Sequence, residues 1–538
     1  MSVATSSACD EGVIKGTPSR APCPVRARPW VLTATILASS MVFIDGTVAN
    51  VALPALQREF GASAASAQWV IESYGLFLTA LLLVGGSAGD RFGRRRVFLI
   101  GVGLFALASA WCGMIGSIEQ LIVARAVQGI GGALLVPGSL ALISASFPED
   151  IRGKAIGTWS GYTAITAALG PIIGGWVIEH LSWRYAFFIN VPLALLIVPM
   201  TFKFVPESRN TDEAKQLDWQ GAALASIGLG CLVFGLIESS TLGWRNPRVV
   251  STLAVTPVAL AAFIVTELRH PAPMLPLHLF RSRNFSGANL LTLLLYAALG
   301  GGLYFFPLNL IQVQGYSATA AGAALLPFIL TIFLLSRWAG GLVDRYGAKL
   351  PLVIGPSIAA LGFALFALPG IGDNYWRTFF PAVLVLGFGM TVSVAPLTTT
   401  VMNALDSKLA GVASGVNNAV SRAASLLAIA LLGIVMTQGF NIAFSQRINP
   451  QSVSPQVLRA LVAQRGKMAA ITPPLEATVA EREVIRTGVS KAYVRGFRWV
   501  MLFSAALAAL SALSAWLMID GRPRAAPAPT RQELADSV

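Results

Sequence analysis

Charged residues are scarce in this sequence. Only 12% of the 538 residues are Asp, Glu, Lys or Arg, whereas 55% are apolar and the mean hydropathy is +0.68. Soluble domains carry roughly 25% charged residues, so this chain cannot cover its folded surface with polar groups. The composition excludes an ordinary soluble or disordered protein and predicts an integral membrane protein.

Cysteine and histidine are also rare. The cysteines Cys9, Cys23, Cys112 and Cys231 lack the CxxC spacing of redox and zinc sites, and the three histidines lack metal-ligand spacing. The glycine triplet 300–302 lies in an apolar run, and no GK[ST] follows it to complete a phosphate-binding loop. We therefore expect no metal and no cofactor, and the sequence excludes a disulfide scaffold and an ATP-driven pump.

Long apolar runs are abundant instead. A transmembrane helix needs about 20 mostly apolar residues, and fourteen such runs follow one another along the chain. The first run is too long for the core of a signal peptide and is predicted to be a retained helix. The predicted spans are 31–53, 69–89, 97–118, 120–146, 154–178, 184–205, 218–238, 249–267, 286–311, 318–341, 350–369, 378–400, 409–437 and 497–519.

Basic residues in short loops predict which ends of the spans face the cytoplasm. With a cytoplasmic N-terminus, most loop arginines and lysines fall on the inner side, and an even number of spans returns the C-terminus there. This pattern accounts for the net charge of +14 without a nucleic-acid partner. We expect a multi-pass protein of the inner (cytoplasmic) membrane with both termini cytoplasmic. The long basic connection 439–495 is placed outside, with some helix in it, because long loops translocate largely regardless of charge.

The chain contains an internal repeat. The loop after the second span reads GSAGDRFGRRR (86–96) and the loop after the tenth reads GGLVDRYGAK (340–349), so Gly, Asp, Arg and Gly recur at the same offsets. GIGGALLVP (129–137) is echoed by GFGMTVSVAP (387–396). Parallel repeats of this kind build transporters with a site between two rocking halves. The predicted organisation is an N-terminal tail (1–30), an N-terminal six-helix bundle (31–205), two inserted helices with linkers (206–285), a C-terminal six-helix bundle with its outer loop (286–519) and a C-terminal tail (520–538).

These segments resemble the signatures of the major facilitator superfamily. The loop 86–96 is similar to its loop signature, LIVARAVQGIGGA (121–133) to its helix-4 arginine motif and ALGPIIGG (168–175) to the helix-5 motif of its antiporters. Together with DGTVANVALP (45–54), they resemble the fourteen-span drug/proton antiporters of the EmrB/QacA type. The resemblance implies an all-α integral membrane protein with the major facilitator fold, in which two six-helix bundles are joined by two inserted transmembrane helices.

The loop motif is expected to form a cytoplasmic gate. Asp90 lies at the inner end of the second span, where its carboxylate can accept hydrogen bonds from helix N-terminal amides or from an arginine across the gap. Gly86 and Gly93 allow close approach of backbones. The alternative is that the arginines serve only topology. The predicted members of the gate are Gly86, Asp90, Arg91, Gly93, Arg94, Asp344 and Arg345.

The motif in the fifth span contains Gly170, Pro171, Gly174 and Gly175. Proline removes a backbone hydrogen bond, and glycine lets a neighbouring helix approach closely. The resemblance implies a hinge that limits leakage and favours export. A plain packing kink is the alternative.

Two opposite charges are expected to meet inside the membrane. Asp45 lies about 14 residues, or roughly 21 Å, from the inner start of the first span, and Arg125 lies about 6 residues, or roughly 9 Å, from the outer start of the fourth. The two depths are measured from opposite sides of the membrane, so in a hydrocarbon core of about 30 Å they correspond to the same level. Ionisable groups within spans are functional hypotheses by default, so we expect this pair to couple proton transfer to transport. A static structural pair is the alternative.

A second charged pair is predicted in the outer third of the membrane. Glu72 is in the first turn of the second span, and Arg422 is roughly 20 Å from the inner start of the thirteenth. In the facilitator fold these helices are neighbours, so we expect the two groups to approach each other, bridged by water or Asn418 where the gap is wide. Glu72 is also assigned to proton coupling. An interfacial carboxylate and a buried helix-pairing arginine are the respective alternatives.

The resemblance implies a proton-coupled secondary active efflux transporter, an antiporter that exports drugs or other amphipathic organic compounds across the cytoplasmic membrane by alternating access. A dedicated exporter of one endogenous metabolite is an open alternative, while the motif at Gly170 disfavours an uptake symporter. A membrane enzyme or sensor would need a catalytic cluster or a soluble domain, so we expect no enzyme. The expected partners are a small organic substrate, protons and the lipid bilayer, with a periplasmic adaptor protein left open.

Overall fold

Apolar helices make up most of the described chain. The computed structural model describes residues 26–208, 218–271, 273–405, 410–448 and 451–520. Fourteen of its helical segments are long and apolar enough to cross a membrane, which confirms the predicted number of spans. Helices suit this composition because they satisfy their backbone hydrogen bonds internally, as a bilayer requires. Most of the two predicted tails lies outside the described residues.

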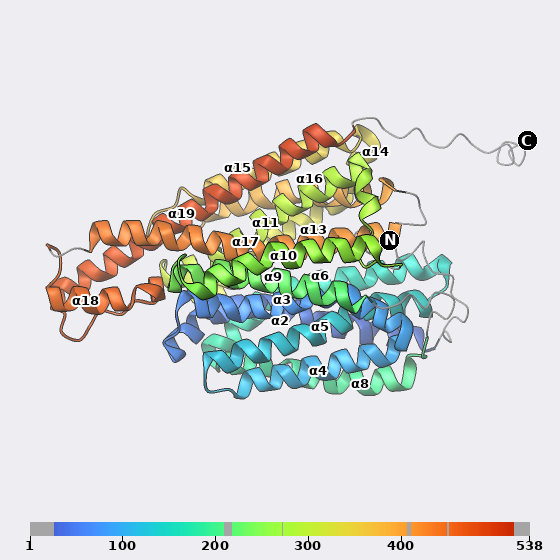
Figure 1. The fold of residues 1–538 in the computed structure, drawn as a ribbon, viewed down its shortest axis with the longest axis horizontal. Coiled ribbons are helices and arrows are strands. Elements are labelled where there is room, and N and C mark those ends of the chain that lie inside the picture. Colours follow the sequence, from blue (N-terminus) through green and yellow to red (C-terminus); the bar gives the residue numbers. More distant parts are fainter. Residues whose placement is uncertain (1–25, 209–217, 272, 406–409, 449–450, 521–538) are drawn as a thin grey trace, which may run out of the picture.

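The helices fall into two halves joined by an inserted pair (Figure 1). The N-terminal half contains α2 (Arg28–Phe60), α3 (Ala64–Phe92), α4 (Arg94–Met114), α5 (Ile118–Ser146), α6 (Glu149–His180), α7 (Trp183–Phe188) and α8 (Asn190–Phe204). The inserted pair is α9 (Trp219–Leu242) and α10 (Pro247–Arg269). The C-terminal half contains η1 (Leu277–Arg281), α11 (Arg283–Gln312), α12 (Ala318–Ala323), α13 (Leu326–Gly340), α14 (Leu342–Tyr346), α15 (Lys349–Phe366), α16 (Phe379–Asn403), α17 (Ala410–Arg447), α18 (Pro455–Ala463), η3 (Arg465–Ala470) and α19 (Val479–Met518).

The same helix pairings recur in both halves. In the N-terminal half α2 packs on α6, and both α3 and α4 pack on α5; in the C-terminal half α11 packs on α17, and both α13 and α15 pack on α16. Glycines of the repeated segments make corresponding contacts. A Cβ atom on Gly131 would lie 2.6 Å from the Phe105 backbone nitrogen, and one on Gly389 would lie 2.4 Å from that of Ala359. The sequence repeat therefore encodes a repeated close approach of backbones.

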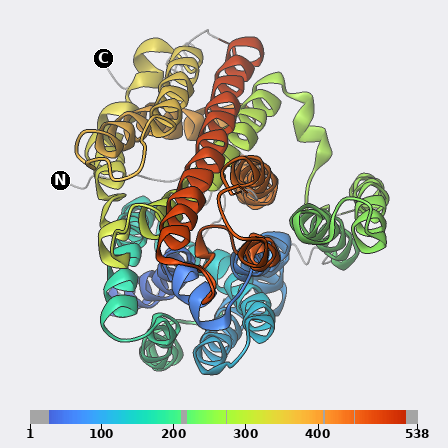
Figure 2. The same cartoon turned by 90° about the vertical axis from the view of Figure 1, so that its left-hand side faces the viewer.

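The helices α9 and α10 stand at the side of the molecule (Figure 2). α9 packs on α3 from one half and α17 from the other, whereas α10 packs mainly on α9. Trp69 of α3 donates its indole N–H to Glu238 of α9 at 2.9 Å. The insertion therefore lies along the seam between the halves.

The two ends of the molecule differ. One end carries the repeated loops 86–96 and 340–349 and is called here the loop-motif end. At the other end α17 and α19, which have 38 and 40 residues, continue well past the neighbouring helices and are joined through α18 and η3. This is called the hairpin end. At 1.5 Å per residue each helix is about 57–60 Å long, against a hydrocarbon core of about 30 Å.

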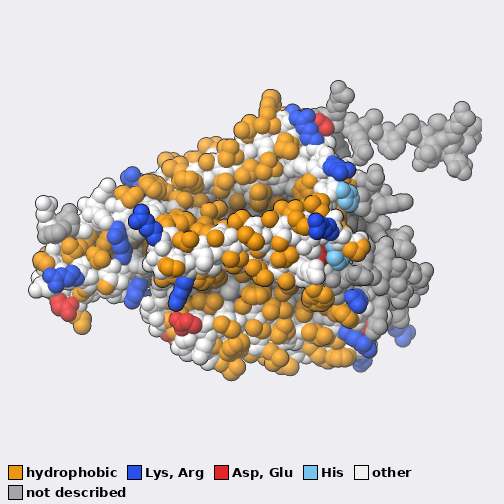
Figure 3. Space-filling view, in the orientation of Figure 1, with side chains coloured by type: hydrophobic (Ala, Val, Ile, Leu, Met, Phe, Trp, Pro, Cys, Tyr) orange, Lys and Arg blue, Asp and Glu red, His pale blue; other side chains and the backbone are white. Residues whose placement is uncertain are grey.

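The predicted spans 409–437 and 497–519 are therefore shorter than the helices that contain them. Much of the predicted loop 439–495 is helical continuation of α17 and α19. On the face drawn in Figure 3, apolar side chains cover the middle of the molecule and charged ones gather toward the two ends. Such a belt is the surface that a bilayer covers.

The segment η3 crosses from the C-terminal half to the N-terminal half. The Lys467 amine lies against Gly61, 3.7 Å from the position of a Cβ there, and a Cβ on Gly466 would lie 3.9 Å from that of Ser63. Met468 is 9% exposed and has a positive φ of 49°, which an unbranched L-residue rarely adopts. The packing around this residue therefore outweighs local backbone preference.

The contact between Gly466 and Ser63 is directly testable. The Cβ separation of 3.9 Å lies within the range of disulfides. In a chain with its natural cysteines replaced, Ser63→Cys with Gly466→Cys should oxidise to an intramolecular cross-link, detected by mass spectrometry. Ser63→Cys with Gly116→Cys is the matched control, since a Cβ on Gly116 has nothing within 4 Å. Equal cross-linking of both pairs would contradict this packing.

Candidate functional site

A buried ion pair joins α2 to α5 in the N-terminal half. Asp45 is 2% exposed and Arg125 is 0% exposed. The Nη1 atom of the Arg125 guanidinium donates to Asp45 Oδ2 in a charge-assisted hydrogen bond. The two groups meet as the comparison of their depths predicts. Removing either partner would leave the other as an uncompensated buried charge, which typically costs about 3–5 kcal/mol.

Two amide side chains complete the coordination of Asp45. Gln128 donates to Asp45 Oδ1 at 2.8 Å and accepts from Arg125 at 2.8 Å, so it bridges both members of the pair. Asn190, the first residue of α8, donates to Oδ1 at 3.3 Å. The carboxylate thus receives three donors from two other helices.

Aromatic rings and a backbone carbonyl hold Arg125 in place. Its guanidinium lies over the Tyr74 ring, 4.2 Å from the centroid, and 5.7 Å from the centroid of Phe187. Its Nε donates to the Val70 carbonyl at 3.1 Å, while its Nη2 has no hydrogen-bond partner in the described chain. A cation over an aromatic face is stabilised where water is absent. The arginine is therefore fixed by contacts that do not depend on Asp45.

Glu72 is buried but is not paired directly with Arg422. It is 1% exposed, and neither of its carboxylate oxygens has a hydrogen-bond partner among the described residues. The helices are neighbours as predicted, since Gln68 of α3 donates to the Ile429 carbonyl of α17 at 2.9 Å.

The helix register explains why this direct pair is absent. Gln68 faces Ile429, and Gly75 faces Leu426. Because the two helices are antiparallel, Arg422 lies roughly 5 residues, or about 8 Å, nearer the loop-motif end than the level of Glu72. A bridged approach through Asn418 or water stays a prediction.

The loop motif folds against its own half. Asp90 pairs with Arg94 at 2.8 Å, four residues along the chain, and the Asp90 side chain is 43% exposed. The expected contact of Asp90 with helix amides or an arginine across the gap is not the arrangement seen here. Gly93 has a φ of 108°, and a Cβ there would lie 2.7 Å from Glu207, so this turn requires glycine.

Glu207 organises the arginines that follow. It accepts from the Arg95 backbone N–H at 3.0 Å and lies 3.9 and 3.8 Å from the Arg95 and Arg96 side chains. Sequence reasoning missed this carboxylate because it follows the sixth span, far from the motif in sequence. In the second copy of the motif, Arg345 is exposed beside the Tyr346 ring, and the Asp344 side chain lies outside the described part.

The motif in the fifth span packs on both halves. A Cβ on Gly170 would lie 2.1 Å from Thr47 Oγ1 of α2, and one on Gly174 would lie 2.5 Å from Val48. A Cβ on Gly175 would lie 2.5 Å from the Ala318 carbonyl of α12. A Cβ on Gly322 of α12 would lie 2.3 Å from the Pro171 carbonyl oxygen. These glycines therefore bring α6 against α2 and against the other half.

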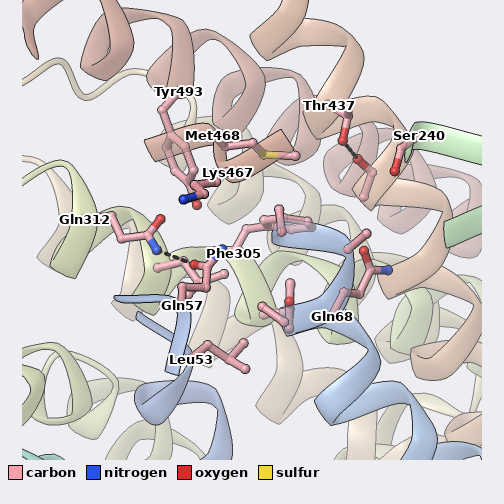
Figure 4. Close-up of a pocket in the computed structure, with 16 residues that line it drawn as sticks. Leu53, Gln57, Gln68, Ser240, Phe305, Gln312, Thr437, Lys467, Met468 and Tyr493 are labelled. Carbon is pink, nitrogen blue, oxygen red and sulfur yellow. Dashed lines mark hydrogen bonds between the residues drawn. The ribbon is translucent and has the colours of Figure 1, made fainter. Parts of the chain in front are cut away.

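Polar contacts between the halves gather at the hairpin end. Gln312 of α11 donates to Gln57 of α2 at 2.7 Å, and Thr319 of α12 donates to Glu179 of α6 at 2.7 Å. Figure 4 shows a pocket here, with Gln57 and Gln312 joined at one side and Met468 and Tyr493 from the hairpin end above them. Both halves line this pocket, and the two hydrogen bonds join the halves at the hairpin end.

Sequence reasoning missed several groups of the buried site. Gln128 lies within the fourth-span motif, Asn190 within the predicted span 184–205, and Tyr74 within the span 69–89. The available signal was a polar side chain inside an apolar run. Only the three-dimensional packing shows which of the many such side chains reach Asp45.

Comparison with known proteins identifies the fold family. The sequence model of the Major Facilitator Superfamily matches residues 35–429. The chain is 35% identical to the "Tetracenomycin C resistance and export protein" of Streptomyces glaucescens over 77% of each chain. It is 33% identical to the "Puromycin resistance protein pur8" of Streptomyces alboniger over 94% of this chain and 93% of the other.

Solved structures agree on the fold. A bacterial homologue of the human lysosomal transporter Spinster, in an inward-facing and unoccupied conformation, superposes with a TM-score of 0.66 at 16% identity, covering 94% of this chain and 100% of the other. The xylose transporter XylE from E. coli superposes with a TM-score of 0.54 at 16% identity, covering 94% of this chain and 99% of the other. The chain belongs to the Major Facilitator Superfamily.

Proposed function

We propose that the protein is a proton-coupled efflux transporter that exports drugs or other amphipathic organic compounds across the cytoplasmic membrane. The observation that carries the proposal is the buried Asp45–Arg125 pair, a titratable charge held within a membrane-spanning bundle. Relatives named for resistance or export, over more than three quarters of the chain, support the direction of transport. A dedicated exporter of one endogenous metabolite is the second candidate, because the relatives named for single antibiotics include one named for its export.

The membrane orientation follows from charge. The loop-motif end carries Arg91, Arg94, Arg95, Arg96 and Arg345, and we assign it to the cytoplasm by the positive-inside rule. Both termini then lie in the cytoplasm, and the hairpin end faces outward, where an adaptor protein would have to bind. The partners are a small organic substrate, protons and the lipid bilayer. No step of this cycle makes or breaks a covalent bond in the substrate, so we propose no enzymatic activity.

Proton exchange at Asp45 would change the forces that hold α2, α5 and α8 together. The ionised carboxylate attracts Arg125 and accepts from Gln128 and Asn190. A proton on Asp45 removes that attraction and leaves Arg125 buried without a counter-charge. The guanidinium would then gain by facing water or an acceptor on the substrate. This competition links the occupancy of the proton site to the occupancy of the substrate site.

Alternating access requires the hairpin end to open and the loop-motif end to close. In this structure, the Gln57–Gln312 and Glu179–Thr319 hydrogen bonds join the two halves at the hairpin end. We propose that Asp90, Arg91 and Arg94, with Asp344 and Arg345, form the opposite gate after closure. The close packing of α6 at Gly170, Pro171, Gly174 and Gly175 would be the hinge. The buried carboxylate of Glu72 lies on the same seam and would become hydrated when the hairpin end opens.

Asp45→Asn should leave the protein folded and able to bind substrate but abolish proton-linked efflux. The amide keeps the shape of the side chain and loses the titrating group. The measurement is efflux of puromycin driven by an imposed pH gradient in everted vesicles, together with proton release on addition of the compound. Ser139→Ala, which removes a buried hydrogen bond to Ser39 between the same two helices, is the matched control. Undiminished gradient-driven efflux in Asp45→Asn would overturn the assignment.

Arg125→Ala should abolish efflux, whereas Arg125→Lys should retain a fraction of it. Lysine preserves a point charge opposite Asp45 but cannot donate at once to Asp45, Gln128 and the Val70 carbonyl as arginine does. Resistance in an efflux-deleted host, normalised to membrane-inserted protein, gives the ranking. Equal activity of the lysine and alanine variants would show that charge at this position is unimportant.

Asp90→Asn should lower turnover more than it weakens substrate binding. Its carboxylate is half-exposed at the loop-motif end, far from Asp45, so the substitution acts on the balance between the two open states. Initial efflux rates at saturating and limiting substrate separate the two effects. A tenfold loss of affinity with normal maximal rate would contradict a gating role.

A further inference from the structure

The junction of α7 and α8 in the sixth span places an amide beside the buried ion pair. The span Trp183–Phe204 is divided at Ile189, so α7 ends at Phe188 and α8 begins at Asn190. The Asn190 side chain is fully buried. Its NH₂ group donates to Asp45 Oδ1 at 3.3 Å and to Ser109 Oγ of α4 at 2.9 Å. One amide therefore contacts the titratable carboxylate and a neighbouring helix at once.

The orientation of this amide is fixed by its neighbours. The Ser109 hydroxyl donates its only hydrogen to the Phe187 carbonyl at 2.8 Å, so its oxygen is an acceptor toward Asn190. Both atoms that face the amide are thus acceptors, and only the NH₂ end satisfies them. The opposite end, Asn190 Oδ1, is buried without a hydrogen-bond partner in the described residues. A buried oxygen without a hydrogen-bond partner is unfavourable. The two hydrogen bonds of the NH₂ group therefore hold the side chain in place despite the desolvation cost at Oδ1.

Asn190 differs from Gln128 in what it contacts. Gln128 lies three residues from Arg125 on α5 and binds both members of the ion pair, so it follows the arginine when α5 moves. Asn190 comes from α8 and is tied to α4 through Ser109. The contact of Asn190 with the carboxylate therefore does not depend on the position of Arg125.

We propose that Asn190 is a positioning residue that stabilises the ionised form of Asp45 and so sets the pH at which Asp45 takes up its proton. The inference rests on the proposed role of Asp45 in coupling. In the exchange, one proton from water binds the carboxylate oxygen to give the neutral acid. Asn190 then donates to a weaker acceptor, and the contact that holds the start of α8 to α2 is weakened.

Other groups around Asp45 contribute to the same balance. Arg125 of α5 favours the charged form, while Tyr74 of α3 and Cys112 of α4 are the further titratable groups that interact with the pair. On its other side α2 packs against Gly170 and Gly174 of α6, which carry no charge. Gln57, where α2 meets α11, lies twelve residues further along. Asn190 is thus the neutral donor to Asp45 that is independent of α5.

The test is a direct titration of Asp45 in the purified full-length protein, which needs no substrate. Infrared difference spectra follow the carboxylic C=O band as the pH is varied, and Asp45→Asn identifies the band that belongs to Asp45. Asn190→Leu removes the donor at similar volume, so the midpoint should rise by about one pH unit, or about tenfold in proton affinity. Asn190→Asp, which is isosteric and adds a second acid, should raise it further. Asn190→Gln, which keeps the NH₂ donor, should recover part of the shift.

Ser139→Ala is again the matched control and should leave the midpoint in place, because Ser139 hydrogen-bonds Ser39 and does not touch Asp45. An unchanged midpoint in both Asn190→Leu and Asn190→Asp would overturn the inference, even where expression or transport falls, since a purely structural role reduces amount or rate without moving a titration. The outcome is separable from the proposed function. Gradient-driven efflux by Asp45→Asn refutes the coupling role, whereas loss of efflux there with an unmoved midpoint in the Asn190 variants refutes only the inference.

Discussion

The ion pair between Asp45 and Arg125 is the constraint on which the N-terminal half depends. Neither charge reaches water in this conformation, so each is stable there only because the other is present. The surrounding amides and the Tyr74 ring improve the geometry, yet they cannot replace a counter-charge. A pair of this kind is sensitive to one proton, because protonation of Asp45 converts a compensated site into an isolated buried cation. That sensitivity, placed between two membrane-spanning helices, is what the proposed proton-driven carrier needs.

The contacts between the halves show how this sensitivity can reach the membrane surfaces. α2 carries Asp45 near its middle and Gln57 near the hairpin end, where it is bound to Gln312 of the other half. α6 packs on α2 at Gly170 and on α12 at Gly175, so a shift of α2 acts on the seam through two routes. The contacts across the seam are hydrogen bonds and close backbone packing, which can be exchanged for water or lipid contacts at modest cost. A few kcal/mol at the buried pair is therefore enough to compete with them.

Local sequence patterns predicted features that depend on residue depth and on helical periodicity. They did not predict features that depend on helix register or on tertiary contacts. The meeting of Asp45 with Arg125 followed from counting residues along straight helices. The same counting placed Glu72 and Arg422 on neighbouring helices but could not give their relative level, because the register of α17 against α3 is set by contacts such as Gln68 with Ile429. Several arginines lie near Asp90 in sequence, and only the fold shows that Arg94 forms the ion pair with it. Asn190 was indistinguishable from other polar residues in apolar runs, and only the packing of α8 on α2 shows that it reaches Asp45.

The two halves share helix pairings but not chemistry. Val383 of α16, in the span that repeats α5, is an apolar residue that is 1% exposed, and the polar cluster of the C-terminal half consists of Asn417, Asn289 and Thr292, joined at 2.7 to 3.2 Å. Neutral amides hold α11 to α17 without responding to a proton, whereas the charged pair ties α2 to α5 only while Asp45 is ionised. The duplicated framework therefore supplies two bundles with the same helix pairings, and among the described residues the buried charge pair belongs to the N-terminal one. Under the proposed function, a proton on Asp45 would change the internal packing of the N-terminal half, whereas the amide cluster of Asn417 and Asn289 would hold the C-terminal half unchanged.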